Sequence, residues 1–294
     1  MLWGVSEGAI YMLLATLSFS IMNICIKKVT HIPPMEVVFF RCFTAMLIAF
    51  GALYKAEVSW IGSNRKLLLL RGFFGTIALY TFFLTIQNIP LASAVTIQYL
   101  SPIFTTIIAI FLLKEKVRHI QWLFFAVSFA GVLLIKGFDE RVSLFYLGVG
   151  IISAIGSAFA YNMVRSLKQK EHELVVVLHF QIFGSVVGFV FSVFNWQMPS
   201  LQDFMFLILT GVFTHIGQLY LTRSLHRENI ANVSILNYTG LIYALTFGYV
   251  FFGETFSLLS IFGIVLVVVG VVLNLIFGKT KTAGILPRES AVAE

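Results

Sequence analysis

Long apolar runs alternate with short polar breaks along the whole chain. Roughly 20 predominantly apolar residues are enough for a helix to cross about 30 Å of hydrocarbon. The breaks between the runs are polar or contain Pro and Gly, as expected for helix ends in water. The pattern predicts ten membrane-spanning helices, at about residues 8–26, 35–54, 67–88, 91–113, 118–136, 144–165, 174–194, 204–223, 231–252 and 256–277.

The second half of the chain resembles the first half when the two are offset by 139 residues, an offset that we call the repeat shift. Segment 231–254 (ANVSILNYTGLIYALTFGYVFFGE) then falls on segment 92–115 (ASAVTIQYLSPIFTTIIAIFLLKE), with Tyr238 on Tyr99 and Glu254 on Glu115. The same shift holds over most of the chain without gaps, which helices that share only their composition would rarely show. Each half has five spans, an odd number, so the two copies must be inserted in opposite directions.

Inverted repeats are a transporter architecture, with the substrate site near the bilayer midplane between the two halves. We therefore expect an all-α integral membrane protein whose ten transmembrane helices form two inverted five-helix repeats around a central cavity. The repeats comprise residues 1–139 and 140–278, and a disordered cytoplasmic tail follows at 279–294.

The composition agrees with a membrane protein. Of the 294 residues, 59% are hydrophobic and only 11% are charged, against about 25% charged residues in soluble chains. The net charge is +7, but the basic residues gather at the ends of spans, which favours a membrane surface as partner over nucleic acid. We interpret Cys25 and Cys42, both in apolar runs, as buried small hydrophobes rather than a disulfide.

The distribution of Lys and Arg predicts the orientation. Fifteen of them lie on the side shared by the two termini, four lie on the opposite side, and Arg41 lies within a span. By the positive-inside rule both termini are cytoplasmic. The first span alone favours the opposite orientation, because Lys27 and Lys28 follow it. The prediction follows the count over all loops. We expect residence in a bacterial cytoplasmic (inner) membrane.

The span at 91–113 carries unexpected polar residues around a proline. Pro102 has no N–H, so the carbonyl of Gln98 loses its helical donor and needs another partner at bilayer depth. Gln98, Ser101 and Thr105 share one helix face, with Tyr99 beside it. We predict a kink at Pro102 and a polar wall of the cavity.

The repeat places a similar group in the ninth span, where Asn237 and Tyr238 precede Gly240, a second predicted point of flexibility. Two matching polar and aromatic segments favour two walls of one substrate site, although polar groups that only join helices are the alternative. The predicted substrate-binding residues are Tyr80, Gln98, Tyr99, Ser101, His215, Gln218, Asn237 and Tyr238.

Arg41 lies some six residues inside the second span, where an arginine is costly unless it is paired or reaches the interface. It either anchors the helix by pairing with Glu36 at the outer interface, which we favour, or faces the cavity and contacts a substrate carboxylate. The acidic residues all lie in loops, tails or span ends, so the spans offer no deep carboxylate as a proton site.

Enzyme motifs are missing. The chain has no Walker loop, no HExxH and no CxxC, and the GxG at 148–150 lies inside a predicted span. We therefore expect neither catalysis nor a cofactor or metal. A membrane-embedded enzyme and a non-transporting membrane sensor or scaffold are the rival classes, but the sequence carries no nucleophile cluster and only a short tail.

Several segments together resemble the drug/metabolite transporter superfamily, EamA-type branch. FFRCFTAMLI, which contains Arg41, is similar to the second helix of that family, and PLASAVTIQYLSPIFTTIIAIFLLKEKV to its fourth helix. In the ninth span Leu241 replaces a proline often found there. The resemblance implies ten helices around a central cavity, alternating access, and substrates such as amino acids or other small metabolites.

The resulting hypothesis is a secondary transporter or facilitator for a small polar metabolite, an amino acid or similar. The alternative is a carrier for a larger aromatic metabolite or vitamin, since the family resemblance includes riboflavin and S-adenosylmethionine carriers. Direction, ion coupling and the choice between monomer and homodimer stay open.

Overall fold

The computed structural model describes residues 7–112, 119–167, 170–227 and 236–277, and its secondary structure in these ranges is entirely helical. The predicted tail at 279–294 and Glu115 lie outside the described residues. The helices are α1 (Glu7–Lys28), α2 (Pro34–Lys55), α3 (Arg65–Asn88), α4 (Leu91–Gln98), α5 (Ser101–Leu112), α6 (His119–Phe138), α7 (Leu144–Leu167), α8 (Glu173–Ser192), the 3₁₀ turn η1 (Val193–Asn195), α9 (Leu201–Arg227), α11 (Thr239–Phe252) and α12 (Leu258–Phe277).

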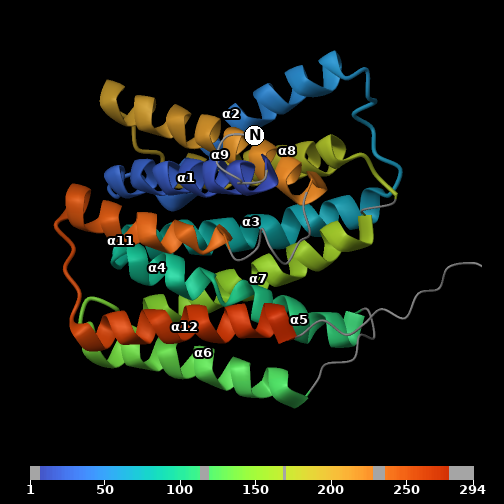
Figure 1. Ribbon diagram of the computed structural model, residues 1–294. Coiled ribbons are helices and arrows are strands. Elements are labelled where there is room, and N and C mark those ends of the chain that lie inside the picture. Colours follow the sequence, from blue (N-terminus) through green and yellow to red (C-terminus); the bar gives the residue numbers. More distant parts are fainter. Residues whose placement is uncertain (1–6, 113–118, 168–169, 228–235, 278–294) are drawn as a thin grey trace, which may run out of the picture.

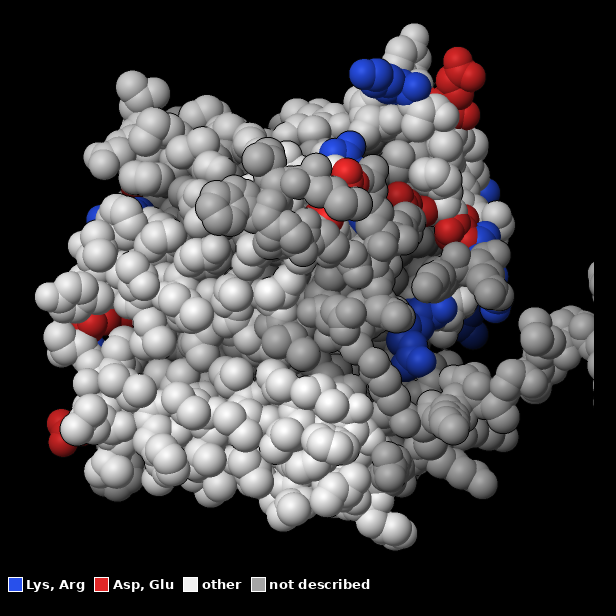
Figure 2. All heavy atoms as spheres, in the orientation of Figure 1, with Lys and Arg blue, Asp and Glu red and all other residues white. Residues whose placement is uncertain are grey.

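The protein is an all-helical membrane protein. Within the described residues, eight helical segments are long and apolar enough to cross a bilayer, α4 and α5 together counting as one. Two shorter apolar helices, Thr239–Phe252 and Leu258–Asn274, lie near the C-terminus. Each of the ten predicted spans overlaps one of these helices, except that 91–113 overlaps two, α4 and α5. Figure 1 shows the helices running side by side across the view, and in Figure 2 the face over α6 and α12 is white among the described residues in view, apart from acidic atoms at its left edge.

Local chemistry sets the helix ends that matter for the site. Pro34 occupies the first turn of α2, where a missing N–H costs nothing. Asn64 caps α3, because its Oδ1 accepts a hydrogen bond from the N–H of Leu67 at 3.3 Å. Pro90 precedes α4 and separates it from α3, because the residue before a proline avoids helical angles. The α11 helix ends at Gly253, whose φ of 63° is the left-handed conformation typical of a C-terminal cap.

Helix pairing crosses the middle of the chain. The most extensive contacts join α1 to α9, α3 to α7, α2 to α8 and α6 to α12. Every one of these pairs combines a helix from residues 1–139 with one from the remainder. In Figure 1, α6 and α12 form the lower layer, and α1 and α9 lie together near the top.

Individual contacts recur at the repeat shift. A Cβ added to Gly72 would lie 2.8 Å from Phe183, and one added to Gly211 would lie 2.5 Å from Thr44. The repeat shift carries Gly72 to Gly211 and Thr44 to Phe183, so the two contacts are equivalent. In the α6–α12 pair, Ser128 Oγ donates to the carbonyl of Val267, its own repeat equivalent, at 3.3 Å.

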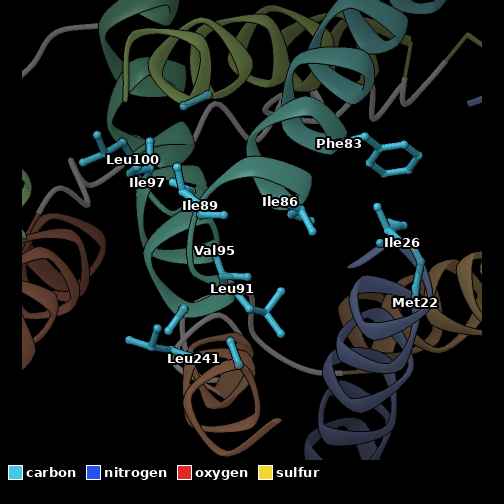
Figure 3. Close-up of a cluster of buried hydrophobic side chains, with 14 of the residues drawn as sticks. Met22, Ile26, Phe83, Ile86, Ile89, Leu91, Val95, Ile97, Leu100 and Leu241 are labelled. Atoms are coloured by element: carbon cyan, nitrogen blue, oxygen red, sulfur yellow. The ribbon is translucent and has the colours of Figure 1, made fainter. Parts of the chain in front are cut away.

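Apolar side chains fill the space where α1, α3, α4 and α11 meet. Figure 3 shows Ile26, Phe83, Leu91 and Leu241 entering this region from those four helices. The first three are fully buried, and Leu241 is nearly so. Since lipid is as apolar as these side chains, their stabilisation comes from close packing rather than from leaving water. This core lies along α4 up to the break that follows it.

Candidate functional site

The helix that begins at Leu91 breaks at Tyr99 and Leu100 and resumes at Ser101 as α5. The N–H of Leu100 bonds to the carbonyl of Ile97, three residues back, at 3.0 Å, so the chain tightens before the break. Pro102 follows as the second residue of α5 and has no N–H to continue the ladder. The break directs the side chain of Tyr99 toward the start of α11.

Tyr99 and Tyr238 form an aromatic pair across the two halves of the chain. Their ring centroids are 4.8 Å apart at 57°. The hydroxyl of Tyr99 donates to the main-chain carbonyl of Asn237 at 2.9 Å. This approach requires a glycine at position 240, because a Cβ there would lie 2.5 Å from the Tyr99 hydroxyl. Four of the predicted site and flexibility residues are thus brought together.

The side chain of Gln98 contacts α7. Its Nε2 donates to Ser157 Oγ at 2.8 Å, and its Oε1 accepts from Ser153 Oγ at 2.9 Å, so the amide is held on α7. The structure does not join the Gln98 side chain to Asn237, although both residues remain partly exposed. Ser101 is buried, and its carbonyl accepts from Thr105 Oγ1 at 2.7 Å.

The remaining predicted residues lie on other helices. Tyr80, on α3, is partly buried against the apolar core. His215 and Gln218, on α9, are partly exposed. A polar contact between Thr16 Oγ1 and Thr239 Oγ1, 3.1 Å long, joins α1 to the start of α11. Of the predicted set, the structure thus brings together Tyr99, Asn237, Tyr238 and Gly240, and the other members lie elsewhere on α3, α4, α5 and α9.

Arg41 is buried inside the bundle. Its Nε donates to Thr214 Oγ1 at 3.2 Å and its Nη1 to Gln181 Oε1 at 3.4 Å. The favoured alternative, an interfacial pair with Glu36, is not formed in the structure, where Glu36 instead accepts the N–H of Gln197 at 3.1 Å. The reason is geometric, since the side chain extends toward α8 and α9 rather than along α2.

Sequence reasoning missed a second intramembrane arginine. Arg71 lies within α3, and its Cζ is 4.2 Å from the ring centroid of Phe180, whereas Arg41 Cζ is 5.5 Å from the same ring. The orientation count placed Arg71 among the basic residues of the loops and their flanks, although the predicted span 67–88 contains it. Its position inside a predicted span was the feature of the sequence that could have identified it as an intramembrane arginine.

The end of the bundle at which α1 finishes carries a buried ion pair. Lys27 Nζ lies 2.5 Å from Glu254 Oε1, and the two side chains are only 12% and 7% exposed. Both carboxylate oxygens accept the N–H of Leu91, at 3.0 and 2.8 Å, while Lys27 also donates to the carbonyl of Ile89 at 2.6 Å. A negative charge at the first N–H of α4 is favourable for the helix dipole. We call Lys27, Glu254 and the N-terminus of α4 the latch.

A second ion pair adjoins the latch. Arg141 bonds to Asp139 at 2.9 Å and donates to the carbonyl of Thr255 at 2.5 Å, which ties the loop before α7 to the segment after α11. The hydrogen bond with Asp139 raises the pKa of the Arg141 guanidinium above its ordinary value. The guanidinium of Arg141 therefore stays charged at physiological pH.

Two recesses in the described surface lie away from the tyrosine pair. One, of about 290 Å³, is an apolar groove between α2 and α8 that includes Phe43 and Val186. The other, of about 270 Å³, lies beside Gly62 and Glu171. The described residues contain no cluster of three or more His, Cys, Asp or Glu suited to a metal ion.

Comparisons with known proteins bear on this geometry. The model of the EamA-like transporter family matches residues 6–137 and again residues 144–276. The pseudopaline exporter of Pseudomonas aeruginosa is 29% identical over 268 residues, covering 90% of this chain and 94% of the exporter. Human solute carrier family 35 member G1 is 29% identical, covering 84% of this chain and 73% of its own. A solved crystal structure has the same fold, with 15% identity and a TM-score of 0.68 over 92% of this chain and 97% of its own.

Proposed function

Because this chain belongs to the EamA-like transporter family, we propose that it is a secondary transporter which moves a small polar metabolite, such as an amino acid, by alternating access. The observation that carries the proposal is the break between α4 and α5, where Tyr99 meets its equivalent Tyr238. A broken helix with a polar and aromatic lining is typical of transporter substrate sites.

Two inverted repeats, residues 1–139 and 140–278, are part of the proposal. The two separate family matches fall within these units. Contacts between equivalent residues also support it, because residues on a two-fold axis must meet their own copies. Tyr99 with Tyr238 and Ser128 with Val267 are such pairs. Opposed units of this kind can rock against each other about a site between them.

The proposed substrate site centres on the tyrosine pair and extends to Gln98 and the polar residues of α3 and α9. Pro102 and Gly240 stand beside it and permit the helix segments to shift. Stacking on tyrosine rings suits a substrate with a flat or apolar part. Gln98, held between two serines of α7, supplies both an amide donor and an acceptor when those bonds are exchanged for substrate.

The latch is the proposed gate at one end. The distribution of basic residues predicts that both termini face the cytoplasm of a bacterial cell, and the latch then lies at the outer end. Lys27 and Glu254 close the outer path while the protein faces the cytoplasm.

Purified protein in liposomes tests the proposal. Counterflow is measured by mass spectrometry with a panel of isotope-labelled amino acids, nucleosides and vitamins, against liposomes without protein. Flux above this background for at least one solute is expected, and its absence across the panel refutes transport of this class.

A bridged variant separates alternating access from a continuous pore. Lys27→Cys and Glu254→Cys are combined in a chain with Cys25→Ala and Cys42→Ala, and a bifunctional maleimide joins the two thiols. Flux should stop after bridging and persist after treatment with a monofunctional maleimide. Undiminished flux through the bridged protein contradicts a gate at this position.

A further inference from the structure

Two arginines lie against one phenyl ring inside the membrane-spanning bundle. The guanidinium groups of Arg71, from α3, and Arg41, from α2, both lie over Phe180 of α8. Gly75 makes room for this arrangement, because a Cβ there would lie 2.8 Å from the Phe180 ring and would also collide with Arg71. We call Arg41, Arg71 and Phe180 the arginine cluster.

Within the part of the chain that the structure describes, the arginine cluster has no counter-ion. None of the ion pairs among the described residues involves Arg41 or Arg71. Arg41 has neutral partners, Thr214 and Gln181. For Arg71, the buried Nε and Nη1 atoms have no hydrogen-bond partner within the described ranges. A cation–π contact offsets only part of the free energy that each buried ion loses in leaving water.

The cluster also departs from the repeat. At the repeat shift, Arg41 falls on Phe180 and Arg71 falls on Thr210. The scaffold of the second half therefore packs with uncharged residues at the matching places. The two charges exist in one half alone, so the fold shared by both halves does not require them.

The helix that carries Arg71 adjoins the helix that holds Gln98. α3 packs along α7, and Ser157 of α7 bonds to Gln98 at 2.8 Å. Phe74 of α3 stacks on Phe159 of α7 with ring centroids 4.7 Å apart, and Arg71 lies about one helical turn from this contact. A solute that reached from the tyrosines to Arg71 would place one end in an apolar and aromatic setting and the other beside a cation.

We propose that Arg71, supported by Arg41, binds a carboxylate group of the transported solute. The two coplanar oxygens of a carboxylate match the planar donors of a guanidinium, which makes this pairing stronger and more specific than one with a lysine. The bound anion would satisfy the unpartnered nitrogens of Arg71 and neutralise the cluster. The inference rests on the proposed function and defines the chemical class of its substrate.

Matched acid and amide pairs test the inference by binding. Thermal shifts of the detergent-purified protein are recorded with succinate against succinamide and with glutarate against glutaramide, because a ligand of the folded state raises its melting point. Each amide has the carbon skeleton of its acid and no carboxylate. The acids should raise the melting temperature at concentrations where the amides do not. An equal response to acid and amide overturns the proposal. Inorganic phosphate and chloride are run separately, and a response to either that equals the acid response also overturns it.

Substitutions test whether the binding of the acid depends on Arg71. Arg71→Gln should weaken the apparent affinity for the acid at least tenfold, whereas Arg65→Gln, at the exposed start of the same helix, should leave it unchanged. An unchanged affinity in Arg71→Gln refutes the assignment. If Arg71→Gln fails to fold, Arg71→Lys keeps the charge and removes the planar donor pair. Its acid affinity should still fall, and an unaltered value refutes bidentate binding.

The two proposals can fail separately. Acid binding that depends on Arg71, with no flux of any solute in liposomes, would contradict transport and support the arginine cluster as a carboxylate site. Flux that is equal for acid and amide and unaffected by Arg71→Gln would support transport and refute the carboxylate site.

Discussion

Replacing Glu254 by Gln should open the latch. The substitution keeps the shape of the side chain and one acceptor for the N–H of Leu91, but it removes the charge that Lys27 pairs with at 2.5 Å. Breaking a buried ion pair by neutralising one partner costs about 3–5 kcal/mol. Because Lys27 retains slight exposure, we take the lower figure of about 3 kcal/mol, which corresponds to about a hundredfold change in an equilibrium.

The change can be measured at Ser93, which lies in the first turn of α4, next to the latch. Ser93 is fully buried in the structure, so a cysteine there should react slowly with a membrane-impermeant thiol reagent. In a Ser93→Cys chain without Cys25 and Cys42, Glu254→Gln should increase the labelling rate by up to about a hundredfold. The increase reports the population of molecules in which the outer end is open.

The control is Glu140→Gln, which removes an exposed carboxylate at the same end of the bundle. It should not change the labelling rate. Lys27→Met, alone and combined with Glu254→Gln, completes a double-mutant cycle that isolates the pairwise interaction. Equal labelling rates in the parent, Glu254→Gln and Glu140→Gln proteins would refute the reasoning, as would a coupling near zero.

Three further predictions concern the tyrosine pair and its surroundings. Gly240→Ala should cost about 1–3 kcal/mol of stability through overpacking against the Tyr99 hydroxyl, which a lower melting temperature would report. The control Gly148→Ala has open space around it and should be neutral or slightly stabilising. Equal effects of the two substitutions would refute the contact. Tyr99→Phe leaves the carbonyl of Asn237 without its donor and should cost about 1 kcal/mol and slow flux, and unchanged flux and melting temperature would contradict this. Gln98→Ala should slow transport in liposomes at unchanged expression, whereas a lower melting temperature with undiminished flux would assign Gln98 to helix packing alone.

The sequence revealed the spans because the bilayer imposes its requirement on each segment separately. Every backbone polar group in hydrocarbon must be satisfied within its own helix, so apolar length is sufficient to find α1, α2 and α3 without knowing their neighbours. The break before Pro102 is equally local, since a proline in the middle of an apolar run removes an N–H that the interior of a helix needs. Family membership followed from the same order of segments, and the family match confirms it.

Side-chain partners could not be read from the same pattern. The amide of Gln98 was expected in a cavity wall, and in the structure it bonds to Ser153 and Ser157 of α7. Helical spacing states which residues share a face, but not which neighbour that face meets. Residues 98 and 157 come together only because α7 packs against α3 and α4.

The sequence by itself determined the helical membrane class, the positions of the spans and the internal repeat, because each of these depends on local hydropathy and on comparison of the chain with itself. Tertiary structure alone decided the latch between Lys27 and Glu254 and the meeting of Arg41 with Arg71 at Phe180. These contacts join segments far apart in the chain, and their strength depends on burial and on distances of a few ångströms. Only the packing of the helices creates those conditions.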